Sequence, residues 1–526
     1  MILKQIHQDE AAFTDRIVII GGGTTGLYAA HELVRKGKEV LVIESGSEVL
    51  GNFAPETFDS VGKAHEGIRI GRSKSLGGTS NLWGGQLVEF QPVDFLGREW
   101  LPDSKWPVTY DEVAAYHQQT YENLGIGREF QDDALVLKKA GVSNPGFGNG
   151  MELFLTRWLK IPSMAVAYCQ EILSSERLKV LLEHSVDGFE NSEGKITGVR
   201  VVSAKGWRQL ISGSNFILAC GTFEICRLLL HAASSHGGLC PWRNNRNIGR
   251  YFQDHLIGRV ASVEVLDRKR FFNTFSTIVR SGQKFQPKIR LNDTTLRGER
   301  MLNLQGMMVF ESSVGENLVY LKQFVKAAIF SRKFEKIGDL FCNLPACWRH
   351  LLPLMWKYVV ANRVFVPSTA KISLHVQSEQ PARYESSISI DPLAKDHLGL
   401  PKVILDWRAG SEELSSIREF TRRVDSVCRK SGMAELRLES GLENQNEEFL
   451  KTLRDNYHQV GGARMGFSEK DGVVDRNLKL FGTDNLYVVG ASTFRTCGSA
   501  NTTFTALTFV TRLVEHLAFK RQSYPL

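Results

Sequence analysis

The sequence lacks the features that mark several classes of protein. Its eight cysteines are scattered, with no C-x-x-C pair and no neighbouring histidine at metal-ligand spacing. We therefore expect reduced thiols in a cytoplasmic protein and no metal site. No hydrophobic run reaches the roughly 18 residues of a membrane span, and the first residues carry charges where a signal peptide needs an apolar stretch. The sequence thus predicts neither export nor a transmembrane segment.

An excess of one charge is also missing. The 65 Lys and Arg residues against 57 Asp and Glu residues leave a net charge of +8 over 526 residues. Charges of both signs spread along the chain describe an ordinary solvated surface, which argues against a nucleic-acid partner. With 42% hydrophobic residues and only 15 prolines, the chain has the composition of a globular protein with a sizeable core. Its length suggests two or three domain-sized units.

A strand and a glycine-rich turn near the N-terminus predict a dinucleotide site. The apolar run at residues 16–20 (RIVII) leads into GGGTTG at residues 21–26 and then into an amphipathic helix. The first glycine permits the tight turn, the second lets the backbone approach a pyrophosphate, and the third lets the helix pack on the strand. A second apolar strand at 39–43 ends in Glu44, which is placed to bind ribose hydroxyls and argues against a 2′-phosphate. This unit fits FAD and NAD equally well.

Three further segments bear on the choice of cofactor. Residues 72–86 (RSKSLGGTSNLWGGQ) are rich in small residues that let the backbone approach something flat or anionic, and they include Trp83. The second segment is NIGRYFQDH at 247–255. In the third, an apolar strand ends at Gly490 and Ala491, and Asn501 is predicted to cap a long helix whose first turn offers N–H donors.

Taken together, these motifs resemble those of the glucose-methanol-choline (GMC) oxidoreductases. The likeness includes EQP at 379–381, DWR at 406–408 and HQVGGARMG at 458–466, and it keeps the family's order over residues 16–517. It implies an FAD-dependent enzyme that oxidises an alcohol to a carbonyl by proton abstraction and hydride transfer to flavin N5. The loop around Trp83 is nearest the pyranose oxidase-like and bacterial sugar-oxidising members, so the implied substrate is a sugar, a glycoside or another secondary alcohol.

The resemblance also implies an α/β fold with two domains. A Rossmann-like FAD-binding domain would be built from the discontinuous segments 1–110, 175–260 and 442–526. An α+β substrate domain with a mixed or antiparallel sheet would comprise 111–174 and 261–441. Alternating patterns predict strands at 371–377, 386–390 and 402–407, and residues 412–431 predict a covering helix. The aromatic and basic segment 321–366 is either an amphipathic helical pair, a lid or oligomer contact, or a membrane-surface contact.

Two residues are implied as catalytic. His458 matches the family's catalytic histidine, and a neutral imidazole can accept the hydroxyl proton near pH 7. Asn501 matches its partner position, where the side-chain oxygen would cap the helix while the amide orients the hydroxyl. His255 is expected to be structural. His375 faces either the substrate or only the sheet.

The cofactor is expected to be FAD without a covalent link, because Leu82 stands where some members carry an FAD-linked histidine. The residues implied to hold it are Gly21, Gly23, Thr24, Thr25, Gly26, Glu44, Ser45, Gly78, Thr79, Ser80, Asn81, Trp83, Gly84, Val186, Gly221, Gly490, Ala491, Thr502 and Thr503. A small-molecule alcohol is the expected partner, with oxygen, a quinone or a redox protein as electron acceptor. Two alternatives stay open: a flavin-containing lyase that uses the same histidine without net redox, and a non-catalytic flavoprotein scaffold.

Overall fold

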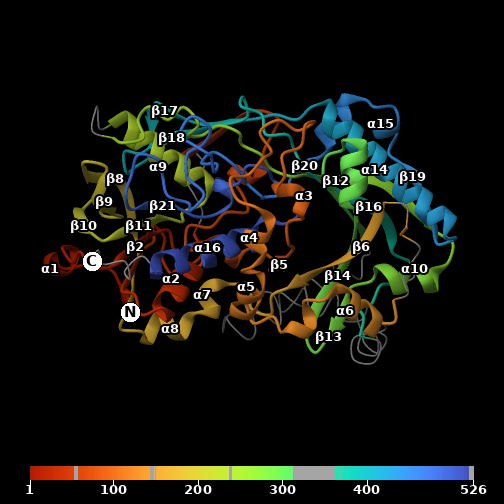
Figure 1. Cartoon of the computed structure of the whole chain (residues 1–526), viewed down its shortest axis with the longest axis horizontal. Helices are drawn as coiled ribbons and strands as arrows, with labels where there is room; N and C mark the ends of the chain where they lie inside the picture. Colours follow the sequence, from red (N-terminus) through yellow and green to blue (C-terminus); the bar gives the residue numbers. More distant parts are fainter. Residues whose placement is uncertain are drawn as a thin grey trace, which may run out of the picture.

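The computed structural model describes residues 1–51, 57–142, 147–148, 150–235, 240–311, 362–367 and 369–519. A six-stranded parallel sheet lies in the left half of Figure 1, in the order β1-β7-β3-β2-β11-β21. Its strands are β1 (Ile2–Leu3), β2 (Ile17–Ile20), β3 (Val40–Ile43), β7 (Leu178–Leu181), β11 (Asn215–Leu218) and β21 (Leu486–Val488). The four central strands are almost wholly buried and apolar, as a parallel sheet covered on both faces requires. The sheet therefore joins chain segments that are hundreds of residues apart.

Helices α2 (Thr24–Arg35) and α16 (Thr502–Phe519) pack together beside this sheet (Figure 1). The Tyr28 hydroxyl of α2 lies 2.8 Å from the Thr511 hydroxyl of α16. A small antiparallel sheet of β8 (His184–Ser192), β9 (Lys195–Ser203) and β10 (Arg208–Ser212) extends the same half of the molecule. Helix α9 (Thr222–Ser235) follows β11 and contacts β8.

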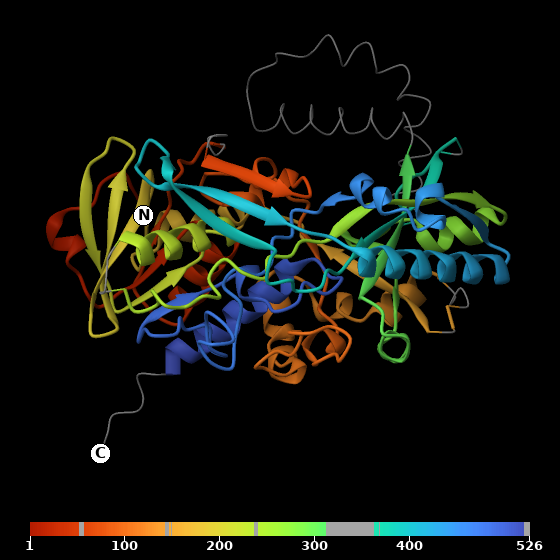
Figure 2. The same cartoon turned by 90° about the horizontal axis from the view of Figure 1, so that it is seen from above.

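A nine-stranded antiparallel sheet dominates the other half of the molecule. Its main order is β19-β12-β16-β15-β14-β6-β5, with β13 beside β14 and β20 beside β12. The strands are β5 (Gln86–Leu87), β6 (Met151–Trp158), β12 (Leu256–Val265), β13 (Ile278–Arg280), β14 (Gln283–Leu291), β15 (Leu304–Glu311), β16 (Lys371–Ser378), β19 (Ala434–Leu438) and β20 (Arg454–Asp455). Helix α14 (Ser411–Lys430) contacts β12, β15, β16 and β19, and it is the long helix at the right of Figure 2. The helix predicted at 412–431 and the strand predicted at 371–377 are thus confirmed.

A third, small sheet combines one strand from the N-terminal part of the chain with two strands from its C-terminal half. It consists of β17 (Ser387–Lys395), β18 (Pro401–Trp407) and β4 (Phe58–Gly62). The strands predicted at 386–390 and 402–407 are confirmed as β17 and β18. They pair with each other, β18 also pairs with β4 rather than with β16, and both pack on α9. The predicted fold class, a Rossmann-like unit from discontinuous segments with a second α+β unit, is confirmed, while the exact domain boundaries stay a prediction.

Short elements complete the described chain. They are α1 (Gln8–Ala11), α3 (Pro92–Phe95), α4 (Tyr110–Ala114), α5 (His117–Asn123), α6 (Asp133–Lys139), α7 (Met164–Ala167), α8 (Cys169–Ser174), α10 (Arg268–Phe275), α11 (Asp293–Glu299), α15 (Ser440–Glu443) and the 3₁₀ turns at Glu66–Ile68, Gly78–Asn81, Arg128–Phe130, Glu447–Thr452 and Ala491–Thr493.

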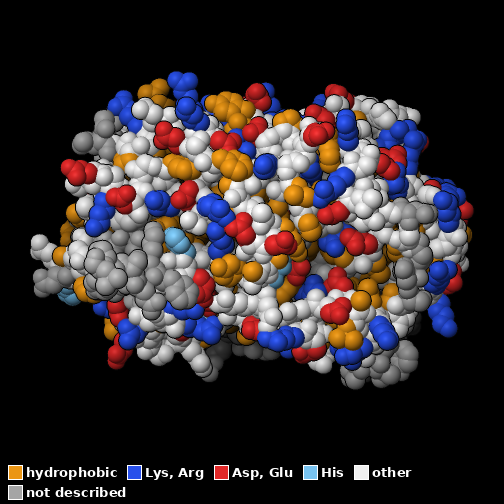
Figure 3. Space-filling model, in the orientation of Figure 1, with side chains coloured by type: hydrophobic (Ala, Val, Ile, Leu, Met, Phe, Trp, Pro, Cys, Tyr) orange, Lys and Arg blue, Asp and Glu red, His pale blue; other side chains and the backbone are white. Residues whose placement is uncertain are grey.

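The surface agrees with the balanced composition. On the face shown in Figure 3, basic and acidic side chains are interspersed. Among the helices that the structure describes, none combines the length and the apolar character that crossing a bilayer requires. Most of the predicted segment 321–366 lies outside the described residues, so its three interpretations stay open.

Candidate active site

The first glycine motif forms the turn between β2 and α2. Gly21 has a φ of +105°, and a Cβ there would lie 2.7 Å from the Cα of Cys220. A Cβ on Gly26 would lie 1.9 Å from the carbonyl oxygen of Gly21, which is far inside contact distance. The predicted packing role of the third glycine is therefore confirmed: α2 can start this close to the strand only because Gly26 has no side chain.

Glu44 lies directly after β3, at the same edge of the sheet. One carboxylate oxygen accepts a hydrogen bond from the Gly22 N–H at 2.8 Å, and the other accepts one from the Gly46 N–H at 2.7 Å. Burial raises the pKa of this carboxyl, and the two backbone donors oppose that rise. Glu44 is thus held rigidly against the glycine turn.

The second glycine loop passes directly over the first. Gly77 and Gly78 have φ values of +91° and +51°, which glycine adopts without strain. A Cβ on Gly78 would lie 2.8 Å from the Cα of Gly23. The two loops therefore approach each other through backbone alone, and they form the two sides of a narrow cleft.

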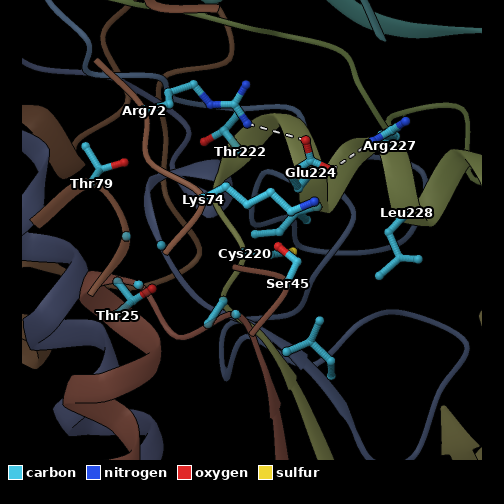
Figure 4. Close-up of a pocket in the computed structure, with 18 of the residues that line it drawn as sticks. Thr25, Ser45, Arg72, Lys74, Thr79, Cys220, Thr222, Glu224, Arg227 and Leu228 are labelled. Atoms are coloured by element: carbon cyan, nitrogen blue, oxygen red, sulfur yellow. Dashed lines mark hydrogen bonds and ion pairs between the residues drawn. The ribbon is translucent and has the colours of Figure 1, made fainter. Parts of the chain in front are cut away.

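This cleft opens into a cavity of about 380 Å³ at the carboxyl ends of the parallel strands. Most of the predicted cofactor residues line it: Gly21, Gly23, Thr24, Thr25, Glu44, Ser45, Gly78, Thr79, Val186, Gly221, Gly490, Ala491, Thr502 and Thr503. Figure 4 shows Thr25 and Thr79 at one end and Arg227 and Leu228 at the other, with Lys74, Ser45 and Cys220 between them. Stretches of sequence from Ile20 to Ala506 thus meet around one elongated space.

Other predicted cofactor residues lie beside the cavity rather than on its wall. The Ser80 hydroxyl donates to the Gly77 carbonyl at 2.5 Å, and the Asn81 amide donates to the Leu76 carbonyl at 2.8 Å. Trp83 is half-buried against the core and donates to the Pro162 carbonyl at 2.9 Å. Gly84 leaves room for the ring of Trp158, since a Cβ there would lie 2.5 Å from it. These contacts fix the shape of the loop, and a direct role in cofactor binding stays a prediction.

A set of charged residues in the cavity was missed by the sequence reasoning. Arg72 and Arg227 each lie 3.4 Å from a carboxylate oxygen of Glu224, as the dashed lines in Figure 4 mark, and Lys74 lines the same wall. Glu224 and Arg227 belong to α9, where nothing in the pattern separates them from ordinary helix-surface charges. The glycine loop pointed to the neighbourhood of Arg72 and Lys74 but not to their side chains.

His458 lies between two residues that line this cavity, Tyr457 and Gln459. It is half-buried, and its ring meets that of His255 edge-on with 5.0 Å between the centroids. Burial is the main cause that lowers the pKa of His458 to about 3, and electrostatic interactions with His255 and Lys288 act in the same direction. The imidazole is therefore neutral at physiological pH and has a lone pair available.

The contacts of His255 determine which nitrogen of His458 carries the proton. His255 Nε2 lies 3.1 Å and 2.9 Å from the carbonyl oxygens of Cys497 and Gly498, which only accept, so this nitrogen is the donor. His255 is fully buried, and burial lowers its pKa, so the ring is neutral and its Nδ1 is an acceptor. The 2.8 Å contact between the two Nδ1 atoms then requires that His458 Nδ1 donates.

The neighbouring amides agree with this assignment. Asn456 Nδ2 donates its short hydrogen bond, at 2.7 Å, to the side-chain oxygen of Gln377, and its contact with His458 Nδ1 is longer, at 3.3 Å. Gln377 Nε2 in turn donates to the Ser499 carbonyl at 2.7 Å. The free lone pair of His458 is therefore on Nε2. His255, expected to be structural, supports the neighbouring histidine directly.

Asp254 anchors the backbone of the same loop. Its Oδ1 accepts from the N–H groups of His255 (2.7 Å), Asn456 (3.2 Å) and His458 (3.0 Å), and its Oδ2 lies 3.1 Å from His65 Nε2. Burial by itself would raise the pKa of Asp254, but the bond from His65 and the nearby imidazoles hold it below its ordinary value. Together with Asp455, His65 and Asp254 form a buried group of possible metal ligands that sequence spacing did not indicate. Here Asp254 Oδ1 and both Asp455 oxygens accept from backbone N–H groups, and Asp254 Oδ2 lies against His65.

The structure corrects one part of the Asn501 prediction. The side-chain oxygen of Asn501 is buried, and within the described part of the chain it accepts no hydrogen bond, so it does not cap α16. The prediction failed because a residue before a helix was assumed to turn its side chain back to the first N–H groups. The oxygen instead stays free for a ligand, next to Thr502 and Thr503 on the cavity wall.

The EQP and DWR motifs form buried contacts that support the loop at Asp254. Glu379 of EQP forms a buried bidentate ion pair with Arg98, with distances of 2.6 and 2.8 Å. Gln380 accepts from the indole N–H of Trp407, the tryptophan of DWR, at 2.7 Å, and from the Asp254 N–H at 3.2 Å. His375 is half-buried on β16, and its Nε2 has no partner among the residues described.

Comparison with known proteins gives the same picture. A family model described as GMC oxidoreductase matches residues 382–509, and one described as FAD dependent oxidoreductase matches residues 16–242. The two glycine loops, around Gly21 and Gly78, lie in the second match, and His458 and Asn501 lie in the first.

Full-length relatives are distant in sequence. A 2-methyl-1,2-propanediol dehydrogenase from Mycolicibacterium austroafricanum is 21% identical over 95% of each chain. A 6'''-hydroxyparomomycin C oxidase from Streptomyces lividus is 20% identical over 99% of this chain and 96% of its own. Among solved structures, pyridoxine 4-oxidase from Mesorbium loti aligns with a TM-score of 0.59 at 18% identity, covering 97% of this chain and all 100% of its own.

Proposed function

The chain is a GMC oxidoreductase and FAD-dependent, and from that premise we propose that it oxidises a sugar, a glycoside or another secondary alcohol to a carbonyl, with His458 as the base. The observation that carries this proposal is the neutral His458 with its lone pair on Nε2, beside the cavity that the cofactor residues line. Relatives named for 2-methyl-1,2-propanediol and for 6'''-hydroxyparomomycin C support an alcohol as the substrate class.

The cavity suits the cofactor. The first turn of α2 and the crossing glycine loops offer backbone N–H groups to a pyrophosphate, and Glu44 stands where ribose hydroxyls need an acceptor. The first turn of α16 has no acidic residue. Its N–H groups would therefore be available to stabilise negative charge on the isoalloxazine ring of a bound FAD. FAD, when bound, supplies the hydride acceptor. Leu82 offers no nucleophile for a covalent link, so we propose that FAD is held without one.

His458 and Asn501 divide the work on the substrate. His458 Nε2 takes the proton of the substrate hydroxyl, while His255 keeps the other ring proton on Nδ1 of His458. As the O–H bond breaks, the adjacent C–H bond gives up its electron pair as hydride and a carbonyl forms. The side-chain amide of Asn501, whose oxygen has no partner among the described residues, orients the hydroxyl before transfer, and its N–H groups would stabilise the charge that develops on the substrate oxygen.

The decisive experiment follows flavin absorbance under anaerobic conditions. We expect the wild-type holoenzyme to bleach with a suitable alcohol, and His458→Gln to bleach about 100- to 10,000-fold more slowly while it retains FAD. His7→Gln, at an exposed histidine far from the site, is the matched control and should behave as wild type.

Two outcomes would contradict the proposal. Equal bleaching rates in His458→Gln and wild type would remove His458 as the base. Turnover of an alcohol without any flavin bleaching would select a lyase that uses the flavin only structurally.

A further inference from the structure

The nine-stranded sheet has one apolar face and one polar face. A Cβ on Gly306 of β15 would lie 2.9 Å from the ring of Phe420, so this face packs on α14. Side chains alternate along a strand, so Gln305 points to the opposite side. Gln305 lies directly across from Arg290 of β14 and from Gln377 of β16, and Lys288 is two residues before Arg290. Lys288, Gln305 and Gln377 therefore share the second face, here called the polar face.

The polar face is turned toward the catalytic histidine. Gln377 is buried and its amide nitrogen is 3.3 Å from His255 Nδ1 and 2.7 Å from the Ser499 carbonyl oxygen. The charge of Lys288 contributes to the lowered pKa of His458. The same face also reaches the second glycine loop, because Lys288 Nζ donates to the side-chain oxygen of Gln86 at 3.3 Å.

Lys288 is a buried cation without a counter-ion. Only 2% of the residue is exposed, and the long bond to Gln86 is its hydrogen bond. No carboxylate among the described residues lies within salt-bridge distance of it, whereas Arg290 on the same face is paired with Glu152 at 2.8 Å. Burial lowers the pKa of Lys288 to about 7, because the ammonium form has no opposite charge beside it. A ligand that brings a negative charge to this amine would stabilise the ammonium form.

The neighbouring amides are uncharged and partly unused. Both polar atoms of the Gln305 side chain are buried without a partner among the residues described. Gln86 Nε2 donates to Thr156 at 2.7 Å and to Gln286 at 2.8 Å, so this amide is fixed. The polar face thus offers one ammonium and one free amide to a ligand beside His458.

We propose that Lys288 binds a carboxylate of the substrate, so that the enzyme acts on hydroxy acids of the aldonic or uronic acid type, with Gln305 bonded to their hydroxyls. This inference rests on the proposed function, because it places the acid group of the oxidised alcohol. A carboxylate fits better than a phosphate monoester: one ammonium balances a single negative charge, and the described polar face offers no second free cation. An amino sugar would be repelled by Lys288, and a neutral sugar would leave its charge unbalanced.

The test compares substrates that differ mainly in charge. Anaerobic flavin bleaching is measured with glucuronate against methyl glucoside, gluconate against sorbitol, and glucosamine. We expect kcat/KM of the wild-type holoenzyme to be at least about tenfold higher for the acids, through a lower KM. In Lys288→Gln this preference should shrink to about twofold or less. Lys288→Arg should keep it, and Lys371→Gln, at an exposed lysine of the same sheet, is the control.

A second measurement needs no turnover. Acetate has no hydroxyl to oxidise, so its binding is followed by the change it causes in the visible spectrum of the oxidised flavin. Binding should be saturable in the wild type and in Lys371→Gln, and at least about tenfold weaker in Lys288→Gln. If Lys288→Gln fails to fold or to retain FAD, Lys288→Met, which keeps the length of the side chain but not its charge, takes its place in both measurements.

The outcomes separate this inference from the proposed function. If neutral alcohols bleach the flavin as well as the acids do, or if Lys288→Gln keeps the acid preference, the carboxylate site is wrong while alcohol oxidation stands. If no alcohol of either kind bleaches the flavin, the proposed function fails, and acetate binding alone then decides on Lys288. An acetate response that is absent in the wild type overturns the site in every case.

Discussion

The two large sheets of this protein build binding surfaces in opposite ways. The parallel sheet is covered on both faces, so its side chains make core, and the cavity proposed to hold the cofactor forms only at the ends of its strands. Glycines and helix starts bring backbone close to this cavity. The antiparallel sheet has α14 on one face and presents side chains such as Lys288 and Gln305 on the other. A surface made of backbone tolerates few substitutions, whereas a surface made of side chains can change its ligand residue by residue.

The strongest way to break this comparison is to add a side chain to the backbone surface. In Gly26→Val the new Cβ would lie 1.9 Å from the Gly21 carbonyl oxygen, so α2 must move away from β2. We expect loss of bound FAD and a free energy of unfolding lower by about 3 kcal/mol. The FAD-to-protein absorbance ratio and thermal unfolding measure this. Gly298→Ala, where a Cβ would meet nothing within 4 Å, should be harmless; full FAD content in Gly26→Val would show that backbone proximity is not what the cavity needs.

A smaller effect is expected where the two regions meet, at His255. His255→Phe removes the acceptor of the His458 Nδ1 proton, which lets that proton move to Nε2 and occupy the base position. We expect flavin reduction about 10- to 100-fold slower, with KM changed less than kcat. His255→Gln offers an amide oxygen as acceptor and should recover part of the rate, which a purely packing role would not predict. Identical rates in the two variants would refute the positioning role.

A smaller loss of stability is expected when the buried hydrogen bond between Trp407 and Gln380 is removed. Trp407→Phe removes the indole N–H that donates to Gln380 at 2.7 Å in a fully buried position. We expect the free energy of unfolding to fall by about 1 kcal/mol, with FAD content unchanged. Chemical denaturation gives the value. A loss of FAD in this variant would mean that the two regions depend on each other more than their separate sheets suggest.

The smallest expected effect is the change in the rate of flavin reduction when the pH is lowered. The groups facing His458 are His255, Asp254, Asn456 and Lys288. Burial, together with His255 and Lys288, outweighs Asp254, so the pKa of His458 is lowered to about 3. Protonation removes the base, so the rate is lost only as pH falls through about 3. Flavin reduction at saturating substrate should therefore change by no more than about twofold between pH 8 and pH 5. A limb near pH 6.5, the ordinary histidine value, would show that the imidazole titrates as if exposed.

The sequence predicted best what depends on local pattern. The strands around GGGTTG, Glu44 and the start of α16 follow from apolar runs, glycines and a helix start, and their residues line one cavity. The sequence did not predict that Glu224 and Arg227 line the cavity, because a charged residue on a helix looks the same in sequence whether it faces solvent or a cavity. Lys288 escaped because a strand's inward face depends on its register with distant strands, which a single sequence does not encode. The capping prediction for Asn501 failed because the sequence alone does not show whether a side-chain oxygen before a helix turns to the backbone or stays unpaired.

The position of β21 at the outer edge of the parallel sheet has a consequence for biosynthesis. Strand β11 must remain an open edge until residues 486–488 leave the ribosome, and Thr502 completes the cavity wall only after that. Translation of nearly the whole polypeptide therefore precedes cofactor loading, and the nascent chain carries an uncovered apolar strand for about half of its synthesis. Chaperones that shield such edges should consequently raise the yield of yellow, FAD-loaded enzyme.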